Sequence, residues 1–561
     1  MVNYNFSDTR LCEDSEESGT SINYPDCSLY EVVVNSTKKF PNKTAYIYSG
    51  VEVSYTNFLK QIDDVAKSLK KLNIKKGDKV TICMPNTPEA IITFYAVNKI
   101  GAISNMVHPL SAQNEIKYYL QISKSVAMLI IDYDYELFEV ISAETDVENI
   151  IVATLNESIP HNSNFNKNKI TNKNVMCWKD FIEIGKDINY ETNEFTDSSH
   201  VATILYTGGS TGDPKGVVLT NGNFNYSTSS FLAYSDLDST DNILAIMPIF
   251  HGFGLRSGIH MAYFLGATNV LIPRFDAKNF HVLIEKYKPS YIAGVPTLWN
   301  ALLQDEGMAG VDLSFLKLAV CGGDTLPVNM KIKVDKFLKE HGADIKVRPG
   351  YGLTECLSGG CIVPEGRYKE ESVGIPYPDS IFKIVKPGTS EKVPFGVDGE
   401  ICISSPSVML GYLDDPEKTN EVLKVDEDGL TWLHTGDLGH MDEEGWIFFK
   451  SRIERIIISS GYNIYPQRLE NILINHPNIR EAAVIGIPHP FKMKVPKAYI
   501  VLNEGIEPTD EIKNSIYKHC KENLAKFTIP REFEYIEELP KNKVNKVDYL
   551  ELENYHKNSK K

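Results

Sequence analysis

The chain has 561 residues, and 42% of them are hydrophobic, which is enough to bury the cores of two or more domains. A formal net charge of −16 argues against a nucleic-acid partner, because phosphate backbones are bound by clustered Lys and Arg side chains. The nine cysteines contain no CxxC pair, the N-terminus has no apolar signal segment, and no apolar run approaches membrane-spanning length. We therefore expect a soluble cytoplasmic protein with reduced thiols.

Helix and strand patterns alternate after an acidic segment, residues 1–28, that we expect to be weakly ordered. Apolar residues of 61–74 fall on one helical stripe, and 79–84 has the pattern of a buried strand. Thr87 and the two residues after it are typical of a helix start, and Gly101 of its end. This alternation predicts an α/β fold with layered, largely parallel sheets flanked by helices.

An Asn-rich stretch at 155–174 is interpreted as a surface loop. The alternation of helices and strands changes much later in the chain, near residues 448–461. Beyond that point the sequence predicts a small α+β unit with a short helix, two strands and a longer helix, at 466–476, 480–487, 496–502 and 509–527. We place the boundary at Ser451 to Glu454, which divides the chain into an N-terminal domain (29–451) and a C-terminal domain (452–561).

The segment "YTGGSTGDPKG", residues 206–216, is rich in Gly, hydroxyl residues and a single Lys. Glycines allow successive backbone N–H groups to point at an anion, while hydroxyls add donors and Lys adds charge. The preceding "VATILY" is typical of a strand, so the loop is expected at a strand end, where α/β proteins bind ligands. Lys215 follows Pro214, so the segment lacks the Walker pattern; a flexible surface turn is the alternative.

Six further motifs follow this segment in order, and together the seven resemble those of adenylate-forming enzymes, which include acyl- and aryl-CoA synthetases, firefly luciferase and peptide-synthetase adenylation domains. The resemblance covers nearly the whole chain after residue 28, and long-chain fatty acid CoA ligases are similar in particular. The six motifs are "PIFHGFGL" (248–255), "CGGDTLP" (321–327), "YGLTE" (351–355), "GEICISSPSVMLGY" (399–412), "WLHTGD" (432–437) and "SRIERIIISSGYNIYPQRLE" (451–470).

The resemblance implies an ATP site whose parts bind the phosphates, the adenine and the ribose. The residues implied for the β- and γ-phosphates are Thr207, Ser210, Thr211, Gly212 and Lys215; for the adenine, Tyr351, Gly352, Gly322, Gly323 and Asp324; for the α-phosphate, Thr354; for Mg²⁺, Glu355; and for the ribose, Asp437 and Arg452. Mg²⁺ favours carboxylate and phosphate oxygens, and a carboxylate can accept from two ribose hydroxyls. Taken singly, Tyr351 is more often a packed aromatic, Glu355 a solvated carboxylate, Asp437 a turn residue and Arg452 part of a surface ion pair.

The C-terminal segment "ELPKNKVNKVDYL" departs from the family's Pro-Lys-Thr-x-x-Gly-Lys at Asn542 and Asn545. Counting from Pro540, the resemblance assigns to Lys546 the lysine that bridges the acid and the α-phosphate. It also implies that the C-terminal domain rotates about a pivot at Glu454 between the two half-reactions, and that Gly461 then lines the passage for coenzyme A. Asn tolerates left-handed backbone better than other non-glycine residues, so we expect the turn to survive.

The acid site is implied to include His251, as a gate, and walls around Gly294, Val295 and Pro296. The segments 258–267 and 292–302 are apolar and contain no Lys or Arg, which favours a hydrophobic monocarboxylic acid, with a fatty acid preferred. We expect an AMP-forming acid–CoA ligase that uses ATP, Mg²⁺ and coenzyme A, with peripheral membrane contact for a lipid substrate. An aromatic or sterol-type acid, a carrier-protein acceptor, a luciferase-like monooxygenase and a non-catalytic nucleotide-binding protein stay open, as does the choice between monomer and homodimer.

Overall fold

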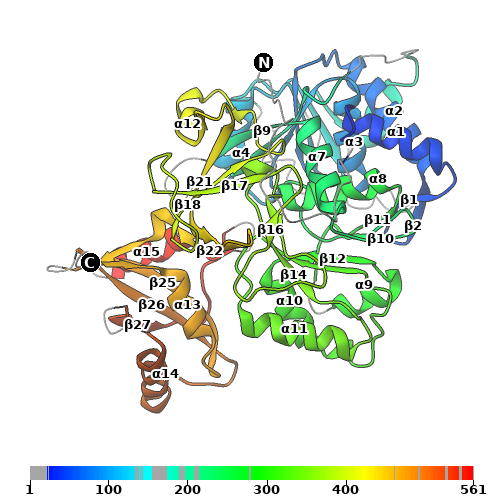
Figure 1. Ribbon diagram of the computed structural model, residues 1–561. Coiled ribbons are helices and arrows are strands. Elements are labelled where there is room, and N and C mark those ends of the chain that lie inside the picture. Colours follow the sequence, from blue (N-terminus) through cyan, green and yellow to red (C-terminus); the bar gives the residue numbers. More distant parts are fainter. Residues whose placement is uncertain are drawn as a thin grey trace.

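The computed structural model describes residues 22, 24–132, 138, 141, 143–154, 174–188, 196–207, 214–276, 279–459, 462–489, 493–524, 528–542 and 546–559. Figure 1 shows three sheets in the part of the chain before residue 453 and a further sheet in the C-terminal part, at the lower left of the view. The predicted loop at 155–174 and most of the lead-in fall outside the described residues. No helix in the described ranges is long and apolar enough to cross a membrane.

An eight-stranded sheet carries the glycine-rich segment at one of its strand ends. Its central strands are parallel, and the two at one edge, β9 and β19, are antiparallel to their neighbours. In spatial order the strands are β19 (Gly411–Tyr412), β9 (Lys215–Thr220), β8 (Val201–Thr207), β4 (Ile103–Met106), β3 (Lys79–Cys83), β5 (Ala127–Ile131), β6 (Asn149–Ala153) and β7 (Val175–Cys177).

A nine-stranded sheet carries the adenine motifs, and its six central strands are parallel. In spatial order the strands are β16 (Ile375–Pro376), β15 (Cys361–Ile362), β14 (Val347–Tyr351), β13 (Leu318–Cys321), β12 (Tyr291–Gly294), β10 (Asn242–Ala245), β11 (Thr268–Leu271), β1 (Thr44–Tyr48) and β2 (Val51–Ser54). The expectation of layered, largely parallel sheets is therefore confirmed for this sheet and for the eight-stranded one.

Helices fill the space between these two sheets and cover their outer faces. One hydrophobic core joins Tyr46 of the nine-stranded sheet, Ile82 of the eight-stranded sheet and Phe94 of a helix between them. A second core, with Trp299 and Val334, packs other helices on the opposite face of the nine-stranded sheet. The helices of this part are α1 (Leu29–Lys39), α2 (Tyr55–Lys71), α3 (Pro88–Lys99), α4 (Gln113–Ser123), α6 (Trp178–Ile184), α7 (Asn221–Leu232), α8 (Met261–Leu265), α9 (Phe280–Tyr287), α10 (Pro296–Gln304) and α11 (Val328–Glu340), together with a π-helix, η3 (Gly254–His260), and short 3₁₀ turns, η5 (Glu306–Met308) and η6 (Thr354–Cys356).

The predicted helices of the N-terminal part are present, and their ends follow the capping signals. Thr87 accepts a hydrogen bond from the N–H of Ala90 and so caps α3, and Gly101, with φ +70°, follows its end. Helix α2 begins earlier than its apolar stripe predicted, because Ser54 caps it by accepting from Asn57 N–H.

A third sheet, which the sequence did not predict as a separate layer, is wholly antiparallel. It carries both the "GEICIS" and "WLHTGD" motifs on neighbouring strands. Its strands are β17 (Ile381–Val385), β18 (Gly399–Ser404), β21 (Thr431–Met441), β20 (Leu423–Val425) and β22 (Ile447–Arg452), and α12 (Pro416–Val422) precedes β20.

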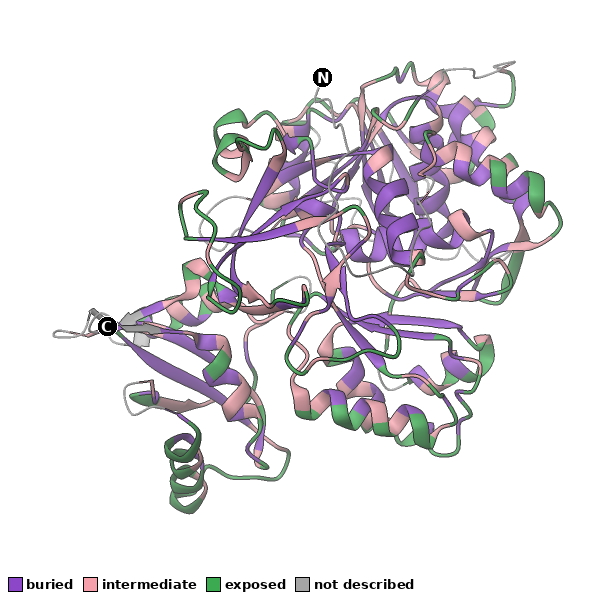
Figure 2. Cartoon of the chain, viewed as in Figure 1, coloured by how far each residue is buried: buried purple, intermediate pink, exposed green. Residues whose placement is uncertain are grey.

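The chain leaves this sheet after β22 and enters the C-terminal sheet at β23, through a 3₁₀ turn, η7 (Ile453–Arg455). The short helix, the two strands and the longer helix predicted here are all present, although much of the longer helix is exposed (Figure 2). The elements are β23 (Ile457–Ser459), β24 (Tyr462–Ile464), α13 (Pro466–Ile474), β25 (Ile479–His489), β26 (Met493–Leu502), α14 (Asp510–Asn523), β27 (Glu532–Tyr535) and α15 (Tyr549–Ser559).

Candidate active site

The glycine-rich segment connects two antiparallel strands, β8 and β9, whose facing ends are Thr207 and Lys215. The expectation that it follows a strand is confirmed, whereas Ser210, Thr211 and Gly212 lie outside the described residues. The ammonium of Lys215 lies 4.8 Å from the centroid of the Tyr412 ring. A cation–π contact of this kind holds the ammonium at the mouth of the loop.

Tyr412 links Lys215 to the carboxylate expected to hold a metal. Its hydroxyl donates a hydrogen bond of 2.9 Å to Oε1 of Glu355, which is buried. Glu355 lies in η6 directly after Thr354, and its carbonyl accepts from Met409 N–H at 2.8 Å. The lysine, the tyrosine and the carboxylate therefore form one continuous row from β9 to η6.

The backbone around η6 turns tightly, and this explains the glycine before it. A Cβ on Gly352 would lie 2.5 Å from the carbonyl carbon of Ser358, which no side chain can occupy. Leu357 and Ser358 both have positive φ, at 52° and 56°. Positive φ is costly for non-glycine residues and is concentrated at functional sites.

Tyr351, Asp437 and Arg452 come together across two sheets. Asp437 and Arg452 face each other in the register of β21 and β22, and Arg452 Nε lies 2.8 Å from Asp437 Oδ1. The hydroxyl of Tyr351 donates to Asp437 Oδ2 at 2.6 Å. Burial raises the pKa of Asp437, while the Arg452 charge and the Tyr351 hydrogen bond act in the opposite direction. The structure thus groups the expected adenine residue with both expected ribose residues.

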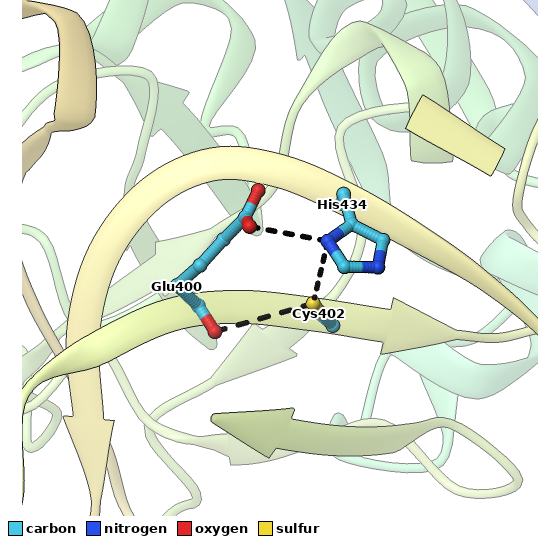
Figure 3. Close-up of side chains that lie close together, drawn as sticks. All are labelled: Glu400, Cys402 and His434. Carbon is cyan, nitrogen blue, oxygen red and sulfur yellow. Dashed lines mark hydrogen bonds and ion pairs between the residues drawn. The ribbon is translucent and has the colours of Figure 1, made fainter. Parts of the chain in front are cut away.

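A buried carboxylate supports the turn that carries Asp437 (Figure 3). Glu400 Oε2 lies 3.1 Å from His434 Nδ1, and Glu400 Oε1 accepts from Gly436 N–H at 3.1 Å. Gly436 has φ +68°, which suits glycine, and Thr435 Oγ1 accepts from Asp437 N–H at 3.0 Å. Glu400 therefore holds both ends of the Gly436 turn.

Cys402 completes this cluster, with Sγ 3.5 Å from His434 Nδ1. Its thiol, the His434 ring and the Glu400 carboxylate are metal-ligating groups, and their ligand atoms lie within 4.8 Å of one another. Both Glu400 oxygens form hydrogen bonds to the segment around Gly436, so we interpret the cluster as a group that stabilises the Gly436 turn.

Lys546 reaches the active site from a turn held by Asn542. Asn542 N–H donates to the Lys546 carbonyl at 2.6 Å, and Lys546 N–H donates to Asn542 Oδ1 at 3.0 Å. The departure from the family's Thr at this position therefore still supplies an acceptor for the turn. Asn545 lies outside the described residues.

The side chain of Lys546 packs against the adenine motif of the N-terminal part. Its Cε lies 3.9 Å from the position that a Cβ would take on Gly323, whose φ is +80°. Burial lowers the pKa of Lys546, and the charges of Asp324 and Asp437 counteract this. The C-terminal lysine therefore lies against the Gly323 turn of the adenine motif.

The charge of Lys546 acts on His251. Burial, with a smaller contribution from the Lys546 charge, lowers the pKa of His251 to about 4, so its imidazole is neutral at neutral pH. Its Nδ1 accepts from Phe253 N–H at 3.1 Å, and the Phe253 Cζ lies 3.6 Å from where a Cβ of Gly322 would be. The segment that carries His251 therefore lies next to the adenine motif, and His251 lies three residues before the π-helix η3, an element often found at functional sites.

The expected acid-site wall follows strand β12. Gly294 ends the strand opposite Cys321, and its N-terminal neighbours are buried. A Cβ on Gly294 would lie 2.7 Å from a methyl group of Leu298, and Val295 Cγ1 lies 3.3 Å from the Cβ position of Gly323. Pro296 begins α10. Val295 therefore adjoins the Gly323 turn, against which Lys546 also packs.

Glu454 lies in the 3₁₀ turn η7 between the antiparallel sheet and the C-terminal sheet, and it is exposed. The expected coenzyme A residue, Gly461, is outside the described residues.

The sequence analysis missed three residues that the structure adds to the site: Tyr412, Glu400 and His434. All three lie within motifs that were identified, so their types and positions were visible. Only the three-dimensional contacts show that Tyr412 joins Lys215 to Glu355 and that Glu400 supports Asp437.

Comparisons with known proteins identify the family. Residues 33–413 match the AMP-binding enzyme family and residues 468–546 match the AMP-binding enzyme C-terminal domain. A long-chain-fatty-acid–CoA ligase of Bacillus subtilis is 32% identical over 542 residues, which are 93% of this chain and 93% of that protein.

Two solved structures have the same fold. An anthranilate CoA ligase in complex with anthranoyl-AMP has a TM-score of 0.83 and 24% identity, covering 96% of this chain and 98% of that one. The o-succinylbenzoate coenzyme A synthetase of Bacillus subtilis, in complex with ATP and magnesium, has a TM-score of 0.76 and 26% identity, covering 93% and 99%.

The fold and the site define an adenylate-forming, AMP-forming acid–thiol ligase. The chain belongs to the AMP-binding enzyme family.

Proposed function

We propose that the protein couples a hydrophobic carboxylic acid, with a fatty acid preferred, to coenzyme A at the expense of ATP. A carboxylate oxygen attacks the α-phosphorus of ATP, the α–β phosphoanhydride breaks and pyrophosphate leaves. The thiol of coenzyme A then attacks the acyl carbon of the adenylate, and AMP leaves. The first step crowds several anions together and the second must exclude water.

The row of Lys215, Tyr412 and Glu355 supports the first step. Lys215, with the amides and hydroxyls of its loop, would bind the β- and γ-phosphates, and Thr354 would donate to the α-phosphate. Glu355 is the residue that would hold Mg²⁺, which neutralises phosphate charge when bound. A buried carboxylate one residue from Thr354 suits a hard cation, because carboxylate and phosphate oxygens are its usual ligands.

Asp437 would accept from the ribose hydroxyls, because its carboxylate offers several acceptor sites even while Tyr351 and Arg452 contact it. Tyr351 would stack against the adenine, and Gly322, Gly323 and Asp324 would follow the adenine edge. A side chain at Gly323 would enter the space that Lys546 approaches.

The position of Lys546 is the observation that carries the proposal. Its side chain lies against the Gly323 turn, where the charges of Asp324 and Asp437 act on it and its own charge acts on His251, and acid and α-phosphate would meet there. This arrangement suits adenylation, whereas thiol attack requires access from the same face. We propose that the C-terminal domain turns about Glu454 between the steps, and that Gly461 then lines the coenzyme A passage.

The acid is proposed to be hydrophobic because the wall at 292–302 is apolar and the Bacillus subtilis relative is named for long-chain fatty acids. The structure of an aromatic-acid ligase on the same fold keeps an aromatic or sterol-type acid as a second candidate. Transfer to a carrier protein is a third.

The test offers the purified protein ATP, Mg²⁺, coenzyme A and acids of increasing chain length and ring content, and measures AMP. Saturation by fatty acids at the lowest concentrations supports the proposal. Saturation by aromatic acids alone favours the second candidate, and AMP formation only with a carrier protein favours the third.

A further inference from the structure

A buried arginine follows His251 on the acid side of the site. Arg256 lies in the π-helix η3, and its side chain belongs to the largest fully buried ones, with 1% of the residue exposed. The neighbouring helix α7 is also buried along nearly its whole length (Figure 2). A guanidinium keeps its charge in proteins, so Arg256 cannot avoid the cost of burial by losing a proton.

The guanidinium has few partners. Nη1 donates a long hydrogen bond of 3.4 Å to the carbonyl of Ser227, and the group lies 4.9 Å from the centroid of the Phe231 ring. Nε of Arg256 and Oγ of Ser227 are both buried, and neither has a hydrogen-bond partner in the described part of the chain. Within that same part, no ion pair of 4.0 Å or less joins Arg256 to a carboxylate.

Arg348 provides the contrast within the same structure. It too is buried, but Nε donates to the Val363 carbonyl at 2.6 Å and Nη1 donates to the Tyr234 carbonyl at 2.7 Å. Arg348 is thus held by two short hydrogen bonds, although its Nη2 has no hydrogen-bond partner among the described residues and it too forms no ion pair there. A buried charge is unfavourable unless it is hydrogen-bonded or paired, and Arg256, with one long hydrogen bond, is satisfied less well than Arg348, so it is the better candidate for a group that binds an anion.

The surroundings of Arg256 connect it to the proposed acid site. It lies five residues after His251, and its charge acts on Cys356, the residue next to Glu355. The Oγ of Ser227 lies 2.5 Å from where a Cβ of Gly359 would be, three residues after Cys356. Ser227, and with it Arg256, thus lies close to the segment that follows η6.

We propose that Arg256 and the Ser227 hydroxyl bind a second anionic group at the far end of the acid, so that the substrate is a dicarboxylic or similarly ω-anionic acid with an apolar body. This inference rests on the proposed function and narrows its hydrophobic acid to one with a second anionic group, in place of the monocarboxylic acid that the sequence favours. The apolar segments 258–267 and 292–302 contain no cation, but Arg256 stands two residues before the first of them. The second carboxylate would pair with the guanidinium in a bidentate fashion and accept from Ser227.

The experiment compares matched acids on the full chain, with AMP formation as the readout. Each pair has the same number of carbons and ends either in a methyl group or in a second carboxylate, for example octanoate and octanedioate. We expect kcat/KM to favour the dicarboxylate at one chain length by about a hundredfold, since a site built around a polar group rejects analogues that lack it. The Arg256→Met variant should lose or reverse that preference, Arg256→Lys should keep part of it, and Arg348→Met should keep it even if it lowers the Tm.

Thermal shift provides a second readout that needs no turnover. The dicarboxylate should raise the Tm of the wild-type protein more than the matched monocarboxylate or sodium chloride does, and the difference should vanish in Arg256→Met. Equal use of both acids by the wild type, an unchanged preference in Arg256→Met, or a Tm rise given equally by chloride would overturn the inference while leaving the ligase proposal intact. If no acid in the panel yields AMP, the proposed function itself fails.

Discussion

Removal of the Lys546 ammonium is the most direct perturbation of the first half-reaction. In Lys546→Ala the turn is kept, because its hydrogen bonds use the Asn542 side chain and backbone groups of residue 546. A cation about 4 Å from a phosphate oxygen contributes about 4 kcal/mol at an effective dielectric constant near 20. At about 1.4 kcal/mol per factor of ten, adenylation should slow by roughly three orders of magnitude.

The assay separates the two half-reactions. Acid-dependent exchange of pyrophosphate into ATP measures adenylation, and thioester formation from a supplied acyl-adenylate and coenzyme A measures the second step. We expect Lys546→Ala to lose the first and retain the second. Lys541→Ala is the matched control, because Lys541 pairs with Glu481 at the base of the same turn. Exchange within tenfold of the wild-type rate in Lys546→Ala would remove this lysine from the reaction.

Three further predictions concern the hinge, the ribose turn and the pH dependence. Glu454→Pro restricts φ in η7, so it should retain pyrophosphate exchange and lose thioester formation; equal loss of both would contradict a pivot. Glu400→Gln weakens charge-assisted hydrogen bonds to His434 and Gly436, each worth about 1.5–3 kcal/mol. The KM for ATP should therefore rise roughly tenfold or more, with a smaller change in kcat. A fall in kcat alone would argue against a role of Glu400 in positioning Asp437. Because the pKa of His251 is lowered to about 4, its ring stays neutral above that pH. His251→Gln should therefore leave the shape of the plot of adenylation rate against pH unchanged between about pH 6 and pH 8. If the wild-type rate falls toward pH 6 and this fall disappears in the variant, His251 titrates in that range.

The sequence predicted the parts of this protein that follow local rules. Thr87, Pro88 and Gly101 bound α3 as their backbone preferences require, and the alternation of elements led to the correct layered class. Ordered motifs also identified residues, such as Tyr351, Asp437 and Arg452, that the structure groups together.

Contacts between distant segments could not be predicted in this way. The antiparallel sheet brings Glu400 beneath Gly436 through strand register, and no local pattern reports that pairing. Arg256 was visible in the sequence, but whether an arginine has a counter-anion depends on burial and on every neighbouring element. That no described carboxylate pairs with Arg256 is visible only in the folded chain.

The fate of the acid's oxygen tests the central claim most directly. An acid labelled with ¹⁸O in both carboxylate oxygens is incubated with the protein, ATP, Mg²⁺ and coenzyme A, and the products are analysed by mass spectrometry. Attack of the carboxylate on the α-phosphorus predicts one ¹⁸O atom in each AMP formed. Label in inorganic phosphate, or AMP that carries none, would contradict an acyl-adenylate.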